Sequence, residues 1–129
     1  MRPTYTYDEA TAAIGELKNH HEIWDGCLLM EPAAPRMGHQ RIVFQLAQAL
    51  SQYVTGHQLG EVFISPLDMV LKPKLCLQPD IAFLRTENLN RAGRKITGPA
   101  DWVAEITYPE GRRRDAVQKL ARYERHGVQ

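Results

Sequence analysis

The sequence predicts a mixed α/β or α+β domain, in which a β-sheet is flanked by helices. Segments with apolar residues at helical spacing are interspersed with short runs rich in β-branched and aromatic residues. The chain has 129 residues, of which 43% are hydrophobic and 24% charged. That length can bury a core of its own, so we expect one domain over residues 1–129.

Three segments predict helices. Thr6 and Glu9 form a capping-box pattern, and the apolar residues that follow predict a short amphipathic helix over residues 7–17. An Arg-rich segment predicts a last helix over about residues 112–126. Between them, HQRIVFQLAQALSQYV predicts a central helix over residues 38–54, with one apolar face made by Ile42, Val43, Leu46, Leu50 and Tyr53.

The β-rich runs come between these helices. HEIWDGCLLM has apolar residues on both sides of Asp25-Gly26, a dipeptide suited to a two-residue type I′ turn, so residues 21–31 are expected to form a β-hairpin. EVFISPLDMVL and LCLQPDIAFL are expected to form two β-rich runs joined by a tight turn at residues 72–74. WVAEITY follows a polar loop or short helix over residues 85–100.

The cysteines, the apolar segments and the net charge limit the classes of protein that fit this sequence. Cys27 and Cys76 have no zinc-binding or CxxC spacing, so both are expected to be buried free thiols. The N-terminus has no apolar signal core and no stretch approaches the roughly 18 apolar residues of a membrane span. We therefore expect a cytoplasmic protein without a membrane partner. The net charge is +1, with the basic excess in the last third, which permits a polyanionic partner without demanding one.

Two lone carboxylates suggest chemistry. Asp80 and Glu105 each stand in an apolar run without an adjacent basic residue, and burying an isolated carboxylate is costly unless it is paired or bound to a metal. Lys119 follows Asp115 and precedes Tyr123 at four-residue spacing, at the margin of an apolar face, from which it can swing inward. This set suits Mg²⁺ or Mn²⁺. The alternative is a turn acid at a strand end for Asp80, a solvent-facing strand acid for Glu105 and a snorkelling surface lysine for Lys119. The apolar face that Lys119 borders is made by Ala116, Val117, Leu120 and Ala121.

The motifs QPDIAF and PADWVAEI, followed by the stripe of Asp115, Lys119 and Tyr123, resemble the PD-(D/E)XK nuclease superfamily. More narrowly, the chain resembles the Uma-type restriction endonuclease family. HEIWDG is similar to that family's YELIDG hairpin, GHQRIV to its HQRIV helix start, and GEVFISPLDMVL to its GxVxxxPxDVxL strand. The resemblance covers about residues 7–128, and the six motifs in order are specific where one alone is weak.

The resemblance implies a restriction-endonuclease-like fold and a divalent-metal-dependent DNA endonuclease. It makes Asp80 and Glu105 the metal ligands, with a backbone carbonyl near Ile106 beside them. Thr107 stands where the motif lysine is usual, and Lys119 would take that role by holding or acidifying the attacking water and screening the scissile phosphate. The hairpin residue Glu22 would be an additional metal-site acid, with an exposed strand residue as the alternative.

Residues placed near the proposed metal could also contact the substrate. His39 could contact water or phosphate, although a capping or core histidine is an alternative. Arg112, Arg114 and Tyr123 on the last helix could bind a DNA backbone, whereas the arginines could also be a solvated helix start.

Two departures from the family pattern keep other interpretations open. Residues 108–111, YPEG, replace a Ser-Pro-Ser-Thr turn, and the sequence stops at HGVQ where relatives continue through an EYWIVDP-like strand. The missing strands are expected to leave a sheet edge that a homodimer would cover. The runner-up function is a catalytically silent nucleic-acid-binding or protein-interaction module that retains the fold. A third possibility is a fragment whose stability depends on dimerisation.

Overall fold

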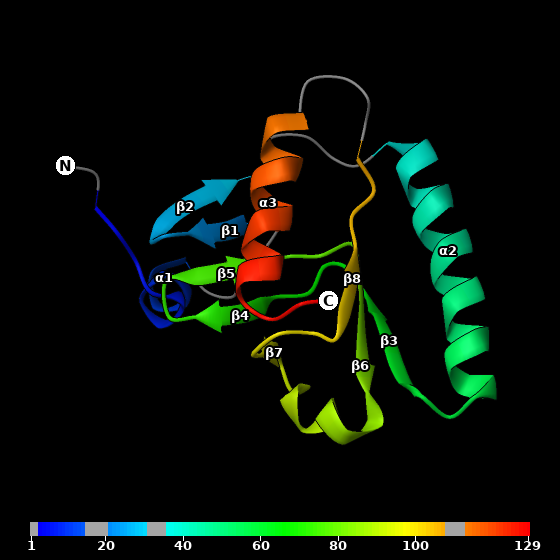
Figure 1. The fold of residues 1–129 in the computed structure, drawn as a ribbon. Coiled ribbons are helices and arrows are strands. Elements are labelled where there is room, and N and C mark those ends of the chain that lie inside the picture. The colour runs from blue at the N-terminus through cyan, green and yellow to red at the C-terminus, as the bar shows by residue number, and fades with distance from the viewer. Residues whose placement is uncertain (1–2, 15–20, 31–35, 108–112) are drawn as a thin grey trace.

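The computed structural model describes residues 3–14, 21–30, 36–107 and 113–129. Within these residues the strands form a five-stranded sheet of order β2-β1-β5-β4-β7 and a three-stranded sheet of order β3-β6-β8 (Figure 1). The elements in chain order are α1 (Tyr7–Ile14), β1 (His21–Trp24), β2 (Cys27–Met30), α2 (Met37–Gly56), β3 (Gly60–Ile64), β4 (Met69–Lys72), β5 (Leu75–Leu77), β6 (Ile81–Arg85), the 3₁₀-helix η1 (Thr86–Arg91), β7 (Ile96–Thr97), β8 (Trp102–Ala104) and α3 (Arg113–Arg125).

The chain runs from β5 of the five-stranded sheet directly into β6 of the three-stranded sheet through a short connection, here called the QPD passage. Residues 78–80, QPD, connect these strands, so the run LCLQPDIAFL is two strands in different sheets and not the single strand expected from the sequence. Asp80 accordingly precedes β6 and does not lie within it. EVFISPLDMVL is likewise divided between β3 and β4. Proline lacks the N–H that a central strand needs, which is consistent with both breaks containing one, Pro66 and Pro79.

The predicted local structure at the N-terminus is confirmed. The amide of Thr6 donates to Glu9 Oε2 at 3.2 Å and the amide of Glu9 donates to Thr6 Oγ1 at 3.1 Å, which is the reciprocal capping box at the start of α1. β1 and β2 pair antiparallel around Asp25 and Gly26, whose φ values of 51° and 85° are those of a type I′ turn. The part of the predicted first helix beyond Ile14 lies outside the described residues.

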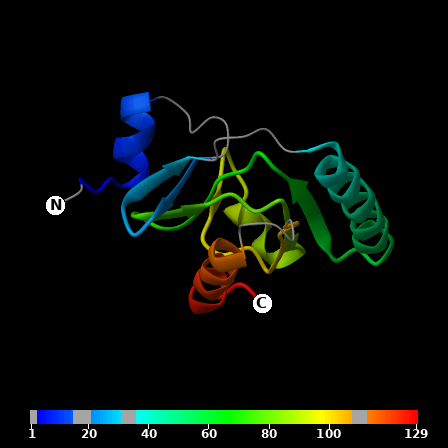
Figure 2. The ribbon, with the colours of Figure 1, turned by 90° about the horizontal axis from the view of Figure 1, so that it is seen from above.

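The helices lie in different places relative to the sheets. Figure 2 shows α1 and α3 on opposite faces of the five-stranded sheet, while α2 lies at the far end of the molecule, next to β3. The core is formed where the sheets meet, by residues of β4, β5 and β6 together with the end of α3. Its fully buried members include Met69, Leu77, Ile81, Leu84, Ile96 and Tyr123.

The predicted inward face of α2 is wrong in part. Ile42 and Tyr53 are exposed, at 50% and 59%, whereas Val43 and Val54 are buried. The inward stripe continues through the partly buried Ala47 and Leu50, at spacings of four, three and four residues. Because α2 packs mainly on the single strand β3, only a narrow stripe of it is covered. No helix in the described part of the chain is long and apolar enough to span a lipid bilayer.

The predicted inward face of α3 is also wrong. Val117 and Leu120 are 63% and 56% exposed, while Tyr123 is buried and the side chain of Lys119 is 15% exposed. Lys119 is thus directed inward, as expected. It is directed inward because the whole of α3 is oriented with this side toward the sheets. α3 presents polar groups to the junction of the two sheets, and its aliphatic residues face outward.

Candidate active site at the junction of the two sheets

Asp80 and Glu105 lie side by side at the end of the three-stranded sheet. β6 and β8 are antiparallel with Ile81 opposite Ala104, so Asp80, which directly precedes β6, and Glu105, which directly follows β8, come from adjacent strand ends. The backbone amide of Ile106 donates to Asp80 Oδ2 at 2.8 Å. The two side chains are 15% and 24% exposed. Neighbouring strands therefore bring both predicted acids to one place.

Lys119 reaches this place from α3. Its ammonium nitrogen is 2.8 Å from Glu105 Oε1 and 2.6 Å from Glu22 Oε2, and it donates to the carbonyl oxygen of Gln78 at 3.1 Å. An ammonium group has three N–H donors, and three acceptors surround this one. Lys119 therefore joins β1, the QPD passage and the end of β8.

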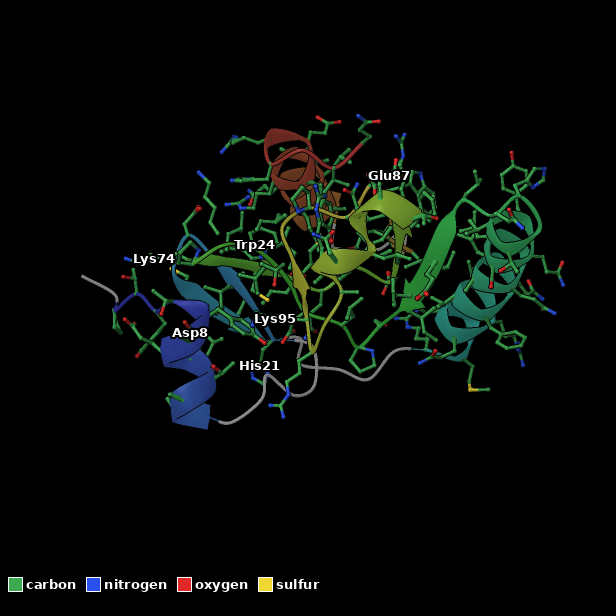
Figure 3. The ribbon with its side chains drawn as sticks, turned by 90° about the horizontal axis from the view of Figure 1, so that it is seen from below. Asp8, His21, Trp24, Lys74, Glu87 and Lys95 are labelled. Carbon is green, nitrogen blue, oxygen red and sulfur yellow. The ribbon has the colours of Figure 1, made fainter. Side chains whose placement is uncertain are left out.

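Glu22 is the acid that β1 contributes. Its Oε2 accepts a hydrogen bond of 2.6 Å from the amide of Gln78, in addition to the contact with Lys119. Its Oε1 accepts one of 3.1 Å from the indole nitrogen of Trp24, which is labelled in Figure 3. Glu22 is thus directed toward Lys119 and the QPD passage.

Gln78 and Asp68 belong to the same network, and neither was predicted from the sequence. The side-chain amide of Gln78 donates to Asp68 Oδ1 at 2.6 Å, and the hydroxyl of Tyr7 donates to Asp68 Oδ2 at 2.9 Å. Gln78 is 6% exposed. The available signal was an uncharged polar residue inside an apolar run, LCLQPDIAFL, which has to find a hydrogen-bond partner when it is buried.

His39 and Tyr123 also contact the acids. His39 Nε2, from the first turn of α2, is 3.3 Å from Asp80 Oδ1, and the hydroxyl of Tyr123 donates to Glu105 Oε1 at 2.6 Å. Arg112 lies outside the described residues, as does the side chain of Arg114. The junction therefore gathers six of the predicted site residues: Glu22, His39, Asp80, Glu105, Lys119 and Tyr123.

Burial and charge alter the acid–base properties of this cluster. Burial raises the pKa of Glu105 from 4.5 to about 7; the ammonium of Lys119 opposes this change and the charge of Asp80 adds to it. Burial lowers the pKa of Lys119, but the carboxylates of Glu105 and Glu22 outweigh it, so this pKa lies above its ordinary value. Burial and then Glu105 raise the pKa of Tyr123. Lys119 is therefore an ammonium ion at neutral pH.

The acids fit one kind of metal site. Mg²⁺ is usually bound through one or two carboxylates and keeps several water ligands, and Asp80 and Glu105 supply two. Oε2 of Glu105 receives no hydrogen bond from any described residue. Among the described residues, no group of three or more His, Cys, Asp or Glu side chains is arranged to hold a metal ion. The donor set thus fits a hydrated hard cation and does not fit a cage made wholly of protein ligands.

The fold is restriction-endonuclease-like, a mixed α+β architecture with sheets flanked by helices. The family Uma2, described as "Putative restriction endonuclease", matches residues 7–129, so the chain belongs to this family.

A solved structure resembles the whole architecture. It is a crystal structure of a nuclease-like protein from Anabaena variabilis ATCC 29413, described as "a putative nuclease belonging to DUF820". The TM-score is 0.81 at 19% sequence identity, and the match covers 96% of this chain and 70% of that one. The comparison with curated proteins found no match. At this identity the structural likeness establishes the fold.

Proposed function

We propose that this chain is a divalent-metal-dependent DNA endonuclease that hydrolyses phosphodiester bonds. The observation that carries the proposal is the convergence of Asp80, Glu105 and Lys119, which come from distant parts of the chain, at one partly exposed point of the sheet junction. Family membership supports the same reaction class.

In this proposal Asp80 and Glu105 hold Mg²⁺ or Mn²⁺. The ion, when bound, supplies Lewis-acid polarisation of the phosphate and a bound water of lowered pKa. The amide of Ile106 fixes the orientation of Asp80 through its hydrogen bond to Oδ2. The ammonium of Lys119, 2.8 Å from Glu105, lies where it can screen the negative charge of a phosphate beside that carboxylate. His39, 3.3 Å from Asp80, is a candidate for contact with water or phosphate.

A plasmid-nicking assay over a metal series tests this function. Wild-type protein should nick DNA with Mg²⁺ or Mn²⁺ and show little turnover with Ca²⁺. Asp80→Ala and Glu105→Ala should each abolish nicking, and Lys119→Ala should lower the rate more than it weakens metal binding. Glu61→Gln is the matched control, because Glu61 is an exposed acid on β3, away from the junction. Wild-type activity no greater than that of Asp80→Ala in every metal would refute the proposal.

A catalytically silent nucleic-acid-binding or protein-interaction module is the second candidate. It is favoured by the lack, among the described residues, of three or more ligating side chains arranged around one point. Thr107 at the usual position of the motif lysine points the same way. A module of this kind would bind DNA, or a protein partner, equally well with and without Mg²⁺ and with Asp80→Ala.

We also infer that two copies of the chain associate through α2 and β3. Phe44 and Ile64 are 69% and 55% exposed, lie on these adjacent elements and line an open groove of about 800 Å³. α2 has no acidic residue and a single arginine, Arg41, so a second α2 could approach with little charge repulsion. Light scattering should give the mass of a dimer, and Phe44→Gln should shift it toward the monomer; a wild-type monomer at high concentration would refute the inference.

A further inference from the structure

Lys119 needs to be held in place. A lysine side chain has four rotatable methylene groups and loses much rotamer freedom when its ammonium is fixed at one point. Two carboxylates, those of Glu105 and Glu22, lie within 2.8 Å of the ammonium nitrogen. Of the two, Glu105 is the proposed metal ligand, so its charge is shared once an ion is bound. Glu22 is the acid whose charge remains for Lys119.

The surroundings of Glu22 differ from those of Glu105. Both oxygens of Glu22 accept hydrogen bonds from the protein, Oε1 from Trp24 and Oε2 from the amide of Gln78. Oε2 also contacts the ammonium, so a second cation at that oxygen would be repelled at short range. Oε2 of Glu105, by contrast, receives no hydrogen bond from any described residue.

The anchoring extends to the backbone that faces Lys119. Gln78 donates its amide to Glu22 and accepts from Lys119 at its carbonyl, so one peptide segment fixes both the acid and the ammonium. The Gln78 side chain is in turn bonded to Asp68 at 2.6 Å. The groups that contact the Lys119 ammonium from this side are therefore themselves held by hydrogen bonds.

We propose that Glu22 is a positioning residue that holds the Lys119 ammonium at the junction, and that it is not a metal ligand. The inference rests on the proposed function for its catalytic meaning, but the geometry of the Glu22–Lys119 pair can be tested without any cleavage. It replaces the expectation from the family resemblance that Glu22 is an additional metal-site acid.

The test compares Glu22→Gln with Glu105→Gln in three measurements. The first is the acetylation rate of Lys119 by a soluble acetylating reagent, followed by mass spectrometry, with the exposed Lys72 as the internal standard. The second is Mn²⁺ affinity by electron paramagnetic resonance. The third is the steady-state kinetics of DNA cleavage. Glu61→Gln, a change of the same chemistry at an exposed strand position, is the control.

Positioning predicts a specific pattern. Glu22→Gln should raise Lys119 acetylation several-fold relative to Lys72 and should weaken Mn²⁺ binding far less than Glu105→Gln does. It should lower kcat by about tenfold or more with little change in KM, the size expected for losing a supporting contact. Unchanged acetylation, or a loss of Mn²⁺ affinity equal to that of Glu105→Gln, would overturn the inference.

A milder variant covers the case in which Glu22→Gln fails to fold. Trp24→Phe removes the indole donor to Glu22 and keeps an aromatic ring beneath Arg122, whose guanidinium carbon is 4.4 Å from the Trp24 ring. It should raise Lys119 acetylation to a smaller extent, and an unchanged rate would count against the inference. If wild-type protein cleaves no DNA, the endonuclease proposal fails while the acetylation result still decides whether Glu22 holds Lys119.

Discussion

α2 and α3 use opposite kinds of surface to attach to the rest of the molecule. α2 has 20 residues and packs through a narrow apolar stripe that begins at Val43 and ends at Val54. α3 has 13 residues and turns Lys119 and Tyr123 inward. Both helices leave aliphatic or aromatic side chains exposed, such as Phe44 on α2 and Leu120 on α3.

The difference shows that a helix's most apolar face need not be the one that faces the protein. The Lys119 ammonium of α3 is surrounded by two hydrogen-bonded carboxylates and a carbonyl from other parts of the chain. Removing one partner of an ion pair this buried is strongly destabilising. In α2, the single supporting strand β3 limits how much apolar surface can be covered. Polar contacts therefore determine the orientation of α3. In α2, the single strand β3 determines how wide a face is buried.

The largest expected effect follows from breaking the polar attachment. Lys119→Met leaves Glu22 and Glu105 partly buried without their cation and should lower the free energy of unfolding by about 3 kcal/mol. Lys72→Met, at an exposed lysine on β4, should change it by less than about 0.5 kcal/mol. Urea unfolding at pH 8 measures both. Equal changes in the free energy of unfolding for the two substitutions would mean that the ion pairs of Lys119 do not stabilise the attachment of α3.

The apolar attachment of α2 gives the next effect. Val43→Ala removes two methyl groups from a side chain that is 6% exposed and should cost about 2 kcal/mol. Phe44→Ala removes a larger side chain but one that is 69% exposed, so it should cost less than about 1 kcal/mol. The comparison has to be made at low protein concentration, where self-association does not contribute. A larger loss for Phe44→Ala would show that the outer face of α2 is covered within the monomer.

The free energy of unfolding should depend on pH through the polar site that α3 contacts and not through the apolar attachment of α2. The folded protein holds a proton on Glu105 up to a pKa of about 7, whereas the unfolded chain releases it near the ordinary value of 4.5. Between these values the folded state binds more protons, so stability should fall as pH rises from 4.5 to 7. Thermal unfolding with a chelator at pH 5 to 8 should show a shallower decline for Glu105→Gln than for wild type. Identical declines would argue against a buried, partly protonated Glu105.

Much of the fold follows from local sequence patterns. The capping box at Thr6 and Glu9 and the hairpin around Asp25-Gly26 depend on contacts within a few residues, and both are present as predicted. The ordered motifs indicated the family and its fold. What the patterns missed is the division of LCLQPDIAFL between two sheets, because only the tertiary arrangement decides which sheet each half joins.

The site was predictable as a set of residues but not as a network. Asp80 and Glu105 could be singled out as lone acids in apolar runs, whereas Lys119 could be singled out only by its offset from Glu105. The role of Gln78 could not, since it acts through its backbone amide and carbonyl, which every residue has. The predictions of the inward faces of α2 and α3 were wrong for a related reason. Apolar periodicity measures which face could be buried, whereas neighbouring elements determine which face is buried.

The smallest expected effect tests the outward face of α3. Leu120 is 56% exposed, so Leu120→Gln removes little buried apolar surface and should change the free energy of unfolding by less than about 0.5 kcal/mol. Leucine and glutamine also have similar helix propensities, so the helix itself should be unaffected. If Leu120 were inward, as its spacing with Ala116 and Val117 suggested, a buried amide would be left without partners and the loss would be several-fold larger. Urea unfolding of Leu120→Gln beside Lys119→Met therefore reports directly which side of α3 faces the sheets.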